Sequence, residues 1–428
     1  MDTSDKRPFG FWTATALVVG GMIGSGIFMM PAALAPFGWI GSLAWIVSIA
    51  GALAIAYTIG RLAQAMPEAS GAVAITGAAL GELPGVLVGW SYWVSVWTAN
   101  AAIATAAASY LAAIFPPLNA TPWLGALTSI ALLWLLTLLN LAGARAAGRF
   151  QVVTTILKLA PLIAVVVIAV SLGAGGDVHL PVLPTGQAVM ASMATAVTLT
   201  LFPLVGFESA GVAAERVRDP ARNIMRASMA GTVVTGLLYI LVCSAIVLIL
   251  SADAVAKSSA PFALFVGQFW GSGASLLVAL FAAIAAIGAL NGWVLIQGEV
   301  PLGMARAGLL PAWFARVSSR DVPIRVLIVS SALATVLILC TTSPTLGGVF
   351  QFMAILASCA TLWLYLAVCV AALVRRIAIP AAAIGLVFSL FAFWGAGWQA
   401  AGLSVVLMLS AIPLYFLRPK AILAEQPA

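Results

Sequence analysis

Residues 20–28 have the sequence Gly-Gly-Met-Ile-Gly-Ser-Gly-Ile-Phe and lie inside a long apolar run that begins near residue 12. Glycine lets the backbone leave the helical conformation. A helix that starts again near Gly24 would present free N–H groups in the middle of the run. Such a helix start favours an anion, for example a carboxylate. The stretch therefore predicts a helix that is broken halfway along its length.

A second stretch of this kind, FPLVGFE, occupies residues 202–208. Pro203 removes a hydrogen bond of the helix, Gly206 permits unwinding, and unwound carbonyl groups suit an ammonium group. For either stretch alone, helix packing through small residues is an alternative explanation. Gly24 and Gly206 each lie midway through the first span of a five-span unit, and this match favours an inverted-repeat transporter with substrate at the bilayer midplane.

The composition places the whole chain in a membrane. Of its 428 residues, 63% are apolar and 7% are charged, against about 45–50% and about 25% in soluble domains. This excludes a soluble enzyme, a disordered chain and a nucleic-acid binder of the usual kind. A span needs about 20 apolar residues, and helices are expected because runs such as LIAVVVIAVSL lack the alternation of a barrel. We predict twelve transmembrane helices near 12–36, 40–64, 84–113, 122–143, 150–173, 192–213, 227–250, 274–304, 325–342, 348–373, 380–397 and 399–417.

The basic residues predict the orientation of these helices. With twelve spans, 17 of the 19 Lys and Arg residues fall on one side, and only Lys158 and Lys257 do not. The 17 are Lys6, Arg7, Arg61, Arg145, Arg149, Arg216, Arg218, Arg222, Arg226, Arg306, Arg316, Arg320, Arg325, Arg375, Arg376, Arg418 and Lys420. Positive loops stay in the cytoplasm, so both termini are expected inside. The net charge of +7 then reflects membrane insertion rather than an acidic ligand.

No residue pattern points to a metal, a cofactor or an active site. The four cysteines lie in apolar runs and are expected to be buried. His179, the single histidine, sits in a polar loop without ligand partners. No soluble domain and no catalytic motif accompanies the spans, so an enzyme is not expected. A channel or a non-transporting receptor is a remote alternative, because no filter residues recur along the chain.

Four stretches resemble the amino acid–polyamine–organocation superfamily: GSGIFMMPAALA (24–35), PEASGA (67–72), VGFESAGVAAERVRDPARNI (205–224) and GMARAGLLPAWFARV (303–317). The nearest likeness is to its basic amino acid/polyamine antiporter branch, of the arginine/agmatine type. The resemblance implies an all-α membrane fold with a 5+5 inverted repeat, discontinuous helices 1 and 6, and helices 11 and 12. One transporter domain would comprise repeats 1–173 and 192–373, followed by 380–417. It would exchange an amino acid for a related amino acid or amine across the bacterial inner membrane.

The same resemblance implies roles for individual residues. The substrate carboxylate would meet the N–H groups of Ser25 and Gly26, and its ammonium group would meet the carbonyls of Met22, Phe202 and Val205. Trp293 matches an aromatic residue that stacks on the substrate side chain, and Phe202 also matches a gating aromatic. Tyr92, Ser95 and Asn100 match the wall of the side-chain pocket, and Glu208 matches a carboxylate of proton sensing and gating. At four positions this chain differs from the arginine/agmatine type: it has Gly21 in place of Asn, Val96 in place of Cys, Phe202 in place of Trp and Ala357 in place of Ser. These differences leave fewer polar contacts for a guanidinium group.

Lys158 lies nine residues after Arg149 in the fifth predicted span, about 13 Å into the bilayer at 1.5 Å per residue. Ionisable residues at such depth are functional by default, with a snorkelling side chain as the alternative. Lys158 resembles the lysine that occupies the sodium position in proton-coupled relatives. We therefore predict that Lys158 and Glu208 couple transport to protons. Lys158 and the less polar pocket favour an alternative function, a proton-coupled symporter of neutral amino acids. The protein could also form a homodimer.

Overall fold

A computed structural model describes residues 10–66, 69, 71–142, 157–175, 189–208, 217, 219–341 and 345–418. Several residues used above lie outside these ranges: Lys6, Arg7, Pro67, Glu68, Ser70, Arg145, Arg149, His179, residues 209–216, Arg218 and Lys420. The predictions that rest on them concern orientation, the histidine loop and part of the family motifs. All residues predicted to bind substrate or couple protons lie inside the described ranges.

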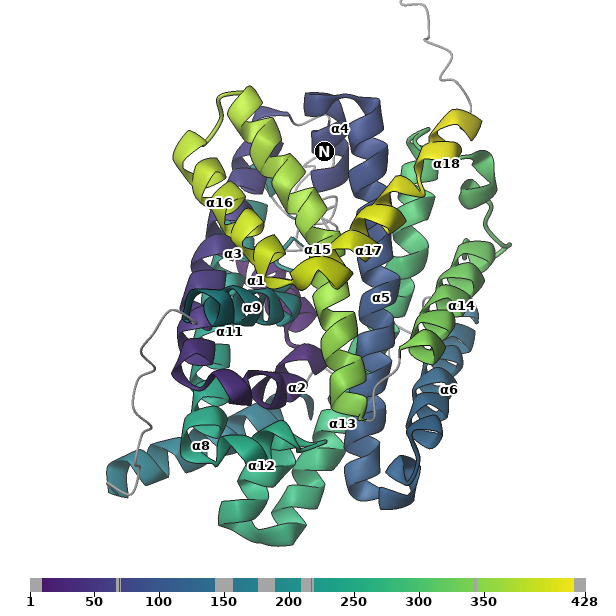
Figure 1. The fold of residues 1–428 in the computed structure, drawn as a ribbon. Helices are drawn as coiled ribbons and strands as arrows, with labels where there is room; N and C mark the ends of the chain where they lie inside the picture. Colours follow the sequence, from purple (N-terminus) through teal and green to yellow (C-terminus); the bar gives the residue numbers. More distant parts are fainter. Residues whose placement is uncertain are drawn as a thin grey trace, which may run out of the picture.

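The described residues form a bundle of helices with no β-strand among them (Figure 1). Within the described part, six helical segments are long and apolar enough to cross a membrane, and a bent helix pair makes a seventh. The six are α3 (Trp39–Ala65), α6 (Pro122–Leu141), α11 (Pro220–Ile249), α13 (Pro261–Arg306), α15 (Leu346–Val374) and the run of α17 (Gly397–Leu409) with α18 (Ile412–Leu417). Four shorter apolar helices are α8 (Leu159–Gly175), α9 (Val189–Leu201), α14 (Ile324–Cys340) and α16 (Ile379–Gly395). The prediction of a multi-pass helical membrane protein is confirmed, and a described helix overlaps each predicted range, while the count of twelve crossings stays a prediction.

Helix α5 (Glu82–Ile114) runs along the middle of the bundle and packs against α13, α15, α6 and α14 (Figure 1). Most of its residues from Gly85 to Ala112 are buried, and many of them are Ala, Ser or Thr. A helix surrounded by other helices does not meet lipid, so it can carry hydroxyl and amide groups that a lipid-facing helix cannot. Its small side chains also let the neighbouring helices approach closely.

The break predicted at Gly24 is present. Helix α1 (Phe11–Met22) ends where Ile23 turns extended (φ −70°, ψ 93°), and α2 (Ser25–Leu34) begins after the extended Gly24 (φ −130°, ψ −156°). The two halves are bent by 48°. The second predicted break is present as far as the described residues reach. Helix α9 ends at Leu201, a short 3₁₀ turn covers Phe202–Leu204, and Gly206 has a left-handed φ of 113°.

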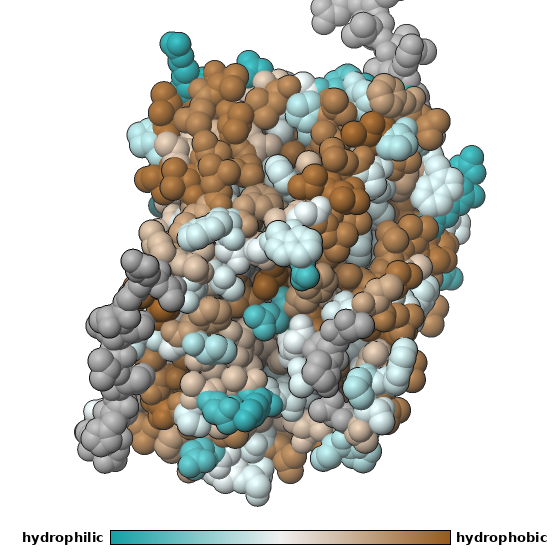
Figure 2. Space-filling model, in the orientation of Figure 1, coloured by the Kyte–Doolittle hydropathy of each residue, from teal (hydrophilic) through white to brown (hydrophobic). Residues whose placement is uncertain are grey.

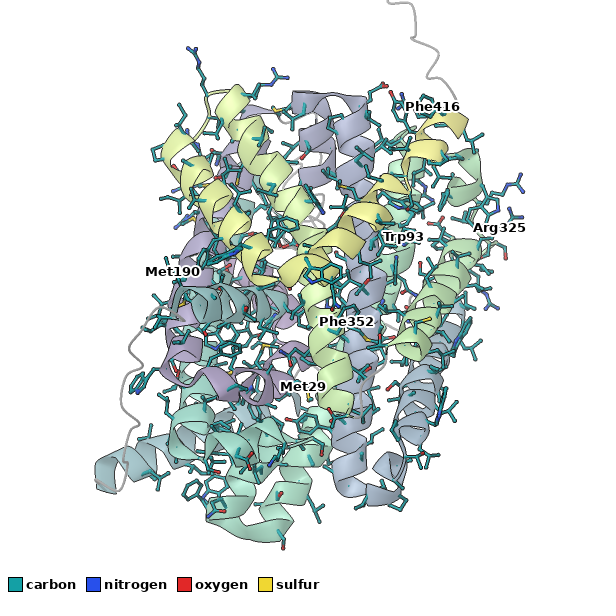
Figure 3. The ribbon with its side chains drawn as sticks, viewed as in Figure 1. Met29, Trp93, Met190, Arg325, Phe352 and Phe416 are labelled. Carbon is teal, nitrogen blue, oxygen red and sulfur yellow. The ribbon has the colours of Figure 1, made fainter. Side chains whose placement is uncertain are left out.

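Arginines at the helix ends gather at one end of the bundle. Arg375 of α15 donates to the Ala78 carbonyl of α4 (Ala72–Leu80), and Arg418 after α18 pairs with Glu82 at the start of α5. At the same end, Arg320 donates to the carbonyl of Ala142 after α6. Figure 1 shows α4 and α18 at the upper end, and Figure 3 labels Phe416 of α18 there. Hydrophilic side chains project from this upper edge in Figure 2, whereas apolar side chains cover much of the face below.

The cysteine prediction is correct for three residues and wrong for one. Cys243, Cys359 and Cys369 are buried between helices, but Cys340 is exposed. Cys340 is the last residue of α14, and this helix has an exposed apolar face that includes Val336 and Leu339. The expectation failed there because an apolar run in a membrane helix can face lipid as well as other helices.

Helix α16 meets α9 through a glycine that leaves no room for a side chain. A Cβ atom on Gly395 would lie 2.0 Å from the Ala194 carbonyl oxygen, so the α9 backbone would have to move. We expect Gly395→Ala to lower the melting temperature of the detergent-purified protein, because overpacking of this kind costs about 1–3 kcal/mol. Gly402→Ala on α17 is the matched control, since no atom lies within 4 Å of its added Cβ. Equal melting temperatures for the two variants would contradict this packing.

Candidate substrate-binding site

A cavity lies where the two helix breaks meet. Its walls come from the α1–α2 break, the turn after α9, and one face each of α5, α13 and α15. The lining residues are Gly21, Met22, Gly24, Ser25, Gly26, Ser95, Ala99, Ile103, Phe202, Pro203, Val205, Trp293, Ala357 and Thr361. The cavity volume is about 30 Å³, enough for about one or two water molecules. A larger ligand therefore needs the lining side chains to move apart.

The start of α2 forms an anion-binding end of the cavity. The first N–H groups of a helix have no partner within it, and at α2 no side chain caps them. Ser25 Oγ is buried, and among the described residues no hydrogen-bond partner reaches it. A Cβ atom on Gly26 would lie 3.0 Å from Pro203 Cβ and 3.1 Å from Phe202 Cδ1. Glycine at this position therefore keeps the cavity open between the two breaks, and the end suits a carboxylate.

The carbonyl end of the same break carries the opposite polarity. Carbonyls at the C-terminus of a helix lack intrahelical partners and carry partial negative charge. Here the Met22 carbonyl accepts a hydrogen bond of 2.7 Å from Tyr239 Oη, and the Gly20 carbonyl accepts one from Lys158 Nζ. Across from them, the Phe202 carbonyl accepts from the Val205 N–H at 3.3 Å. A carbonyl oxygen has a second lone pair, so each of these groups can also accept from an ammonium group.

The side walls between these ends are mostly apolar. Ser95, Ala99 and Ile103 line the cavity from α5, Trp293 lines it from α13, and Ala357 and Thr361 line it from α15. The Ser95 hydroxyl donates to the Tyr92 carbonyl at 2.6 Å, and the Thr361 hydroxyl donates to the Ala357 carbonyl at 3.0 Å. Each hydroxyl is left with acceptor capacity only. Among the described lining residues there is no carboxylate, so this wall offers hydrogen-bond acceptors without a full negative charge.

Seven of the nine predicted binding residues line the cavity. They are Met22, Ser25, Gly26, Ser95, Phe202, Val205 and Trp293. Tyr92 and Asn100 are not among the lining residues. Tyr92 Oη donates to Glu208 Oε1 at 3.0 Å, and Asn100 Nδ2 donates to Gln297 Oε1 at 2.7 Å.

Besides Ala99, two lining residues, Ile103 and Thr361, were not predicted. Ile103 follows Ser95 and Ala99 at intervals of four residues on α5, and Thr361 follows Ala357 by four on α15. Residues four apart share one face of a helix. The spacing could therefore have identified both positions once Ser95 and Ala357 had been placed on the cavity wall.

Glu208 joins three segments of the chain beside the cavity. Its carboxylate accepts hydrogen bonds from Tyr92 Oη of α5 at 3.0 Å, from Tyr365 Oη of α15 at 3.2 Å and from the Gly206 N–H at 3.1 Å. The ring of Phe207 stacks on that of Tyr365 with centroids 5.2 Å apart. These contacts tie the turn after α9 to the two helices that form the side walls.

Lys158 contacts the other side of the α1 break. Its side chain is 4% exposed, and its ammonium group is directed to the Gly20 carbonyl rather than to the surface. The next residue, Gly21, lies close to the second helix break. A Cβ atom on Gly206 would lie 3.5 Å from the Gly21 carbonyl carbon. The segments that carry Lys158 and Glu208 therefore meet two adjacent glycines of α1, Gly20 and Gly21 respectively.

Comparisons with known proteins agree on one family of transporters. The chain matches the model of the amino acid permease family over residues 9–423. It is 32% identical to the cadaverine/lysine antiporter of Escherichia coli over 81% of this chain and 78% of the relative. It is 31% identical to a putative arginine/ornithine antiporter of Bacillus subtilis over 84% and 82%, and 29% identical to the putrescine transporter PotE of Haemophilus influenzae over 93% and 94%.

Trp293 offers a direct test that the cavity is the binding site. We expect Trp293→Ala to weaken the binding of amino acids by about tenfold or more, because this partly buried aromatic ring supplies packing and, for a cationic side chain, cation–π attraction. Binding is measured by scintillation proximity with a panel of labelled amino acids. Trp398→Ala on α17 is the control, since this tryptophan is 83% exposed. Unchanged affinity in Trp293→Ala, with normal yield of folded protein, would place the site elsewhere.

Proposed function

The chain belongs to the amino acid permease family, and from its cavity we propose that it is an antiporter that exchanges an amino acid for a related amino acid or amine. Relatives in this family are antiporters of cadaverine and lysine or, putatively, of arginine and ornithine. The protein is a membrane transporter and not an enzyme. The observation that carries the proposed exchange is the α1–α2 break, where the uncapped start of α2 and the Met22 end of α1, with its carbonyl groups, border one cavity.

We propose the full topology on the same basis. Twelve membrane helices would form a 5+5 inverted repeat, with repeats at 1–173 and 192–373 and two further helices at 380–417. The matching breaks at Gly24 and Gly206 support the repeat. The arginines at one end of the bundle support a cytoplasmic location for that end and for both termini, with the protein in a bacterial inner membrane.

The substrate would bind across the break. Its carboxylate accepts from the N–H groups at the start of α2 and from the Ser25 hydroxyl, and its ammonium group donates to carbonyls of Met22 and Phe202. The side chain then extends between α5 and α15 toward Trp293. Phe202 lies against Gly26 at the anion end, so its ring has to move for a ligand to enter or leave.

Exchange rather than one-way transport follows from the cost of the empty site. Unpaired N–H and carbonyl groups in an apolar environment cost several kcal/mol, in the range of about 2–7 kcal/mol per group. An α2 start without a ligand would carry such groups through the closed state of the transport cycle. Bound substrate satisfies them, so the loaded protein changes conformation more readily than the empty one, and each substrate that leaves is replaced before the return step.

Protons are the proposed coupling ion, through Lys158 and Glu208. Lys158 contacts the Gly20 carbonyl and Glu208 contacts the Gly206 N–H, so a change in charge at either residue acts directly on a helix break. A second candidate function is a proton-coupled symporter of neutral amino acids. It is favoured by Lys158 and by a cavity wall that carries no acidic residue among the described ones.

Counterflow distinguishes the two candidate functions. We expect proteoliposomes loaded with an unlabelled amino acid or its amine to take up the labelled partner, and empty liposomes to take up much less, because exchange needs substrate on both sides. The panel includes lysine with cadaverine, arginine with agmatine, ornithine with putrescine, and neutral amino acids. Net uptake into empty liposomes, driven by an inward proton gradient and equal to the exchange rate, would favour the symporter.

The pH profile of exchange tests the coupling residues. We expect Glu208→Gln to flatten part of the profile, because Gln lacks the negative charge that accepts from Tyr92 and Tyr365. Lys158→Ala should slow net transport while substrate binding persists, since the binding groups belong to the backbone of other segments. Glu299→Gln on α13 is the control carboxylate because, unlike Glu208, it has no hydrogen bond to a helix break among the described residues. Superimposable profiles for wild type, Glu208→Gln and Lys158→Ala would contradict the coupling role.

A further inference from the structure

A chain of buried side chains runs from behind the cavity through four helices. Asn100 Nδ2 of α5 donates to Gln297 Oε1 of α13 at 2.7 Å, and Gln297 Nε2 donates to Ser331 Oγ of α14 at 2.9 Å. Ser331 Oγ lies 2.7 Å from Thr137 Oγ1 of α6, and Thr137 donates to the Leu133 carbonyl at 2.8 Å. Asn100, Thr137, Gln297 and Ser331 are all fully buried.

The direction of the hydrogen bonds in this chain is set at its far end. A carbonyl oxygen can only accept, so the Thr137 hydroxyl proton is used by Leu133. Thr137 can then only accept from Ser331, and the Ser331 oxygen is free to accept from Gln297. The Gln297 amide is thereby turned with its nitrogen toward Ser331 and its oxygen toward Asn100. Asn100 in turn must present its nitrogen to Gln297.

This orientation leaves the Asn100 carbonyl oxygen as the unused end of the amide. Asn100 Oδ1 is fully buried, and no hydrogen-bond donor of the described residues reaches it. A buried acceptor without a donor is costly, and such atoms are uncommon in native structures. Asn100 lies between two residues that line the cavity, Ala99 and Ile103. The unpaired oxygen therefore belongs to a residue of α5 that is next in sequence to the cavity wall but is not itself among the lining residues.

We propose that Gln297 is a positioning residue that holds the Asn100 amide with its oxygen available to the substrate. The side-chain end of the site then selects substrates that carry an N–H donor, such as a distal ammonium group, over substrates of the same length with a methyl end. The inference rests on the proposed amino acid exchange and adds to it the residue that sets this preference. Gln297 acts through Asn100 and does not line the cavity itself.

The position of Gln297 on α13 is itself well anchored. Its backbone carbonyl oxygen accepts a hydrogen bond from Trp93 Nε1 of α5 at 3.0 Å, and Trp93 Nε1 is also 3.1 Å from Ser330 Oγ of α14. Trp93 is labelled in Figure 3, on the stretch of α5 beside α17. Gln297 also follows Trp293 by one helical turn on the same face. The amide that orients Asn100 and the aromatic wall of the cavity therefore move as one unit.

The test compares lysine with norleucine, which differ in an ammonium or a methyl group at the end of the side chain. Both compete for exchange against the labelled amino acid that gives the strongest counterflow. We expect the wild type to prefer lysine by about tenfold or more, and Gln297→Met to lose about tenfold of that preference by weakening lysine alone. Gln297→Glu should keep the preference, because a carboxylate still accepts from Asn100 Nδ2. Trp134→Phe is the structural control, since it removes the hydrogen bond from Trp134 Nε1 to Thr335 Oγ1 between α6 and α14 and leaves the chain from Asn100 to Thr137 intact.

A double-mutant cycle decides whether Gln297 acts through Asn100. Coupled residues give non-additive changes, so Gln297→Met should not alter the lysine-to-norleucine ratio further in an Asn100→Leu background. The inference would be overturned if Gln297→Met left the lysine-to-norleucine ratio unchanged, whether because both amino acids compete more weakly by the same factor or because neither is affected. Gln297 would then be a structural contact only. A wild type that exchanges amino acids without preferring lysine over norleucine would also overturn the inference. Failure of the wild type to exchange any amino acid would instead contradict the proposed function, and this inference with it.

Discussion

The constraint on which the structure depends is that backbone polar groups inside a bilayer need hydrogen-bond partners. A helix break near the middle of a span violates this constraint, and the surrounding side chains compensate. Tyr239 donates to the Met22 carbonyl, Lys158 donates to the Gly20 carbonyl, and Glu208 accepts from the Gly206 N–H. The groups that these side chains leave unpaired are at the start of α2, facing the cavity. Compensation of the break and creation of the binding site are therefore one arrangement.

The helices around the cavity are held by two kinds of contact. Hydrogen bonds between buried side chains join α5, α6, α13 and α14, for example from Asn100 to Gln297 and from Gln297 to Ser331. Where α1, α3, α9, α11 and α16 meet, close glycine contacts accompany hydrogen bonds such as the one between Ser48 and Thr200. A Cβ atom on Gly51, Gly60, Gly231, Gly236 or Gly395 would lie 2.0–2.6 Å from an atom of a neighbouring helix. Both hydrogen bonds and close glycine contacts therefore hold the helices around the cavity.

The sequence predicts the breaks and most of the cavity lining because these features are local. GGMIGSGIF contains the glycines that end one helix and start the next, and seven of nine predicted binding residues do line the cavity. It does not predict Tyr239 as a partner of Met22, or Gln297 as a partner of Asn100, because these pairs lie 217 and 197 residues apart. Such contacts depend on how each helix is rotated in the bundle, and apolar runs facing lipid or protein look alike. The exposed Cys340 is an example of the same ambiguity.

The two ionisable residues beside the break, Lys158 and Glu208, differ from a structural ion pair. Among the described residues, neither Lys158 nor Glu208 takes part in a salt bridge, and each of the three bridges found there has an exposed carboxylate. Lys158 donates to a neutral carbonyl, and Glu208 accepts from two phenols and an N–H group. A buried pair resists a change of charge in either partner, because the remaining charge would be left uncompensated. With neutral partners only, each residue can change its charge independently, and each change alters a hydrogen bond at the helix break. This arrangement suits the proton-coupling role proposed for both residues.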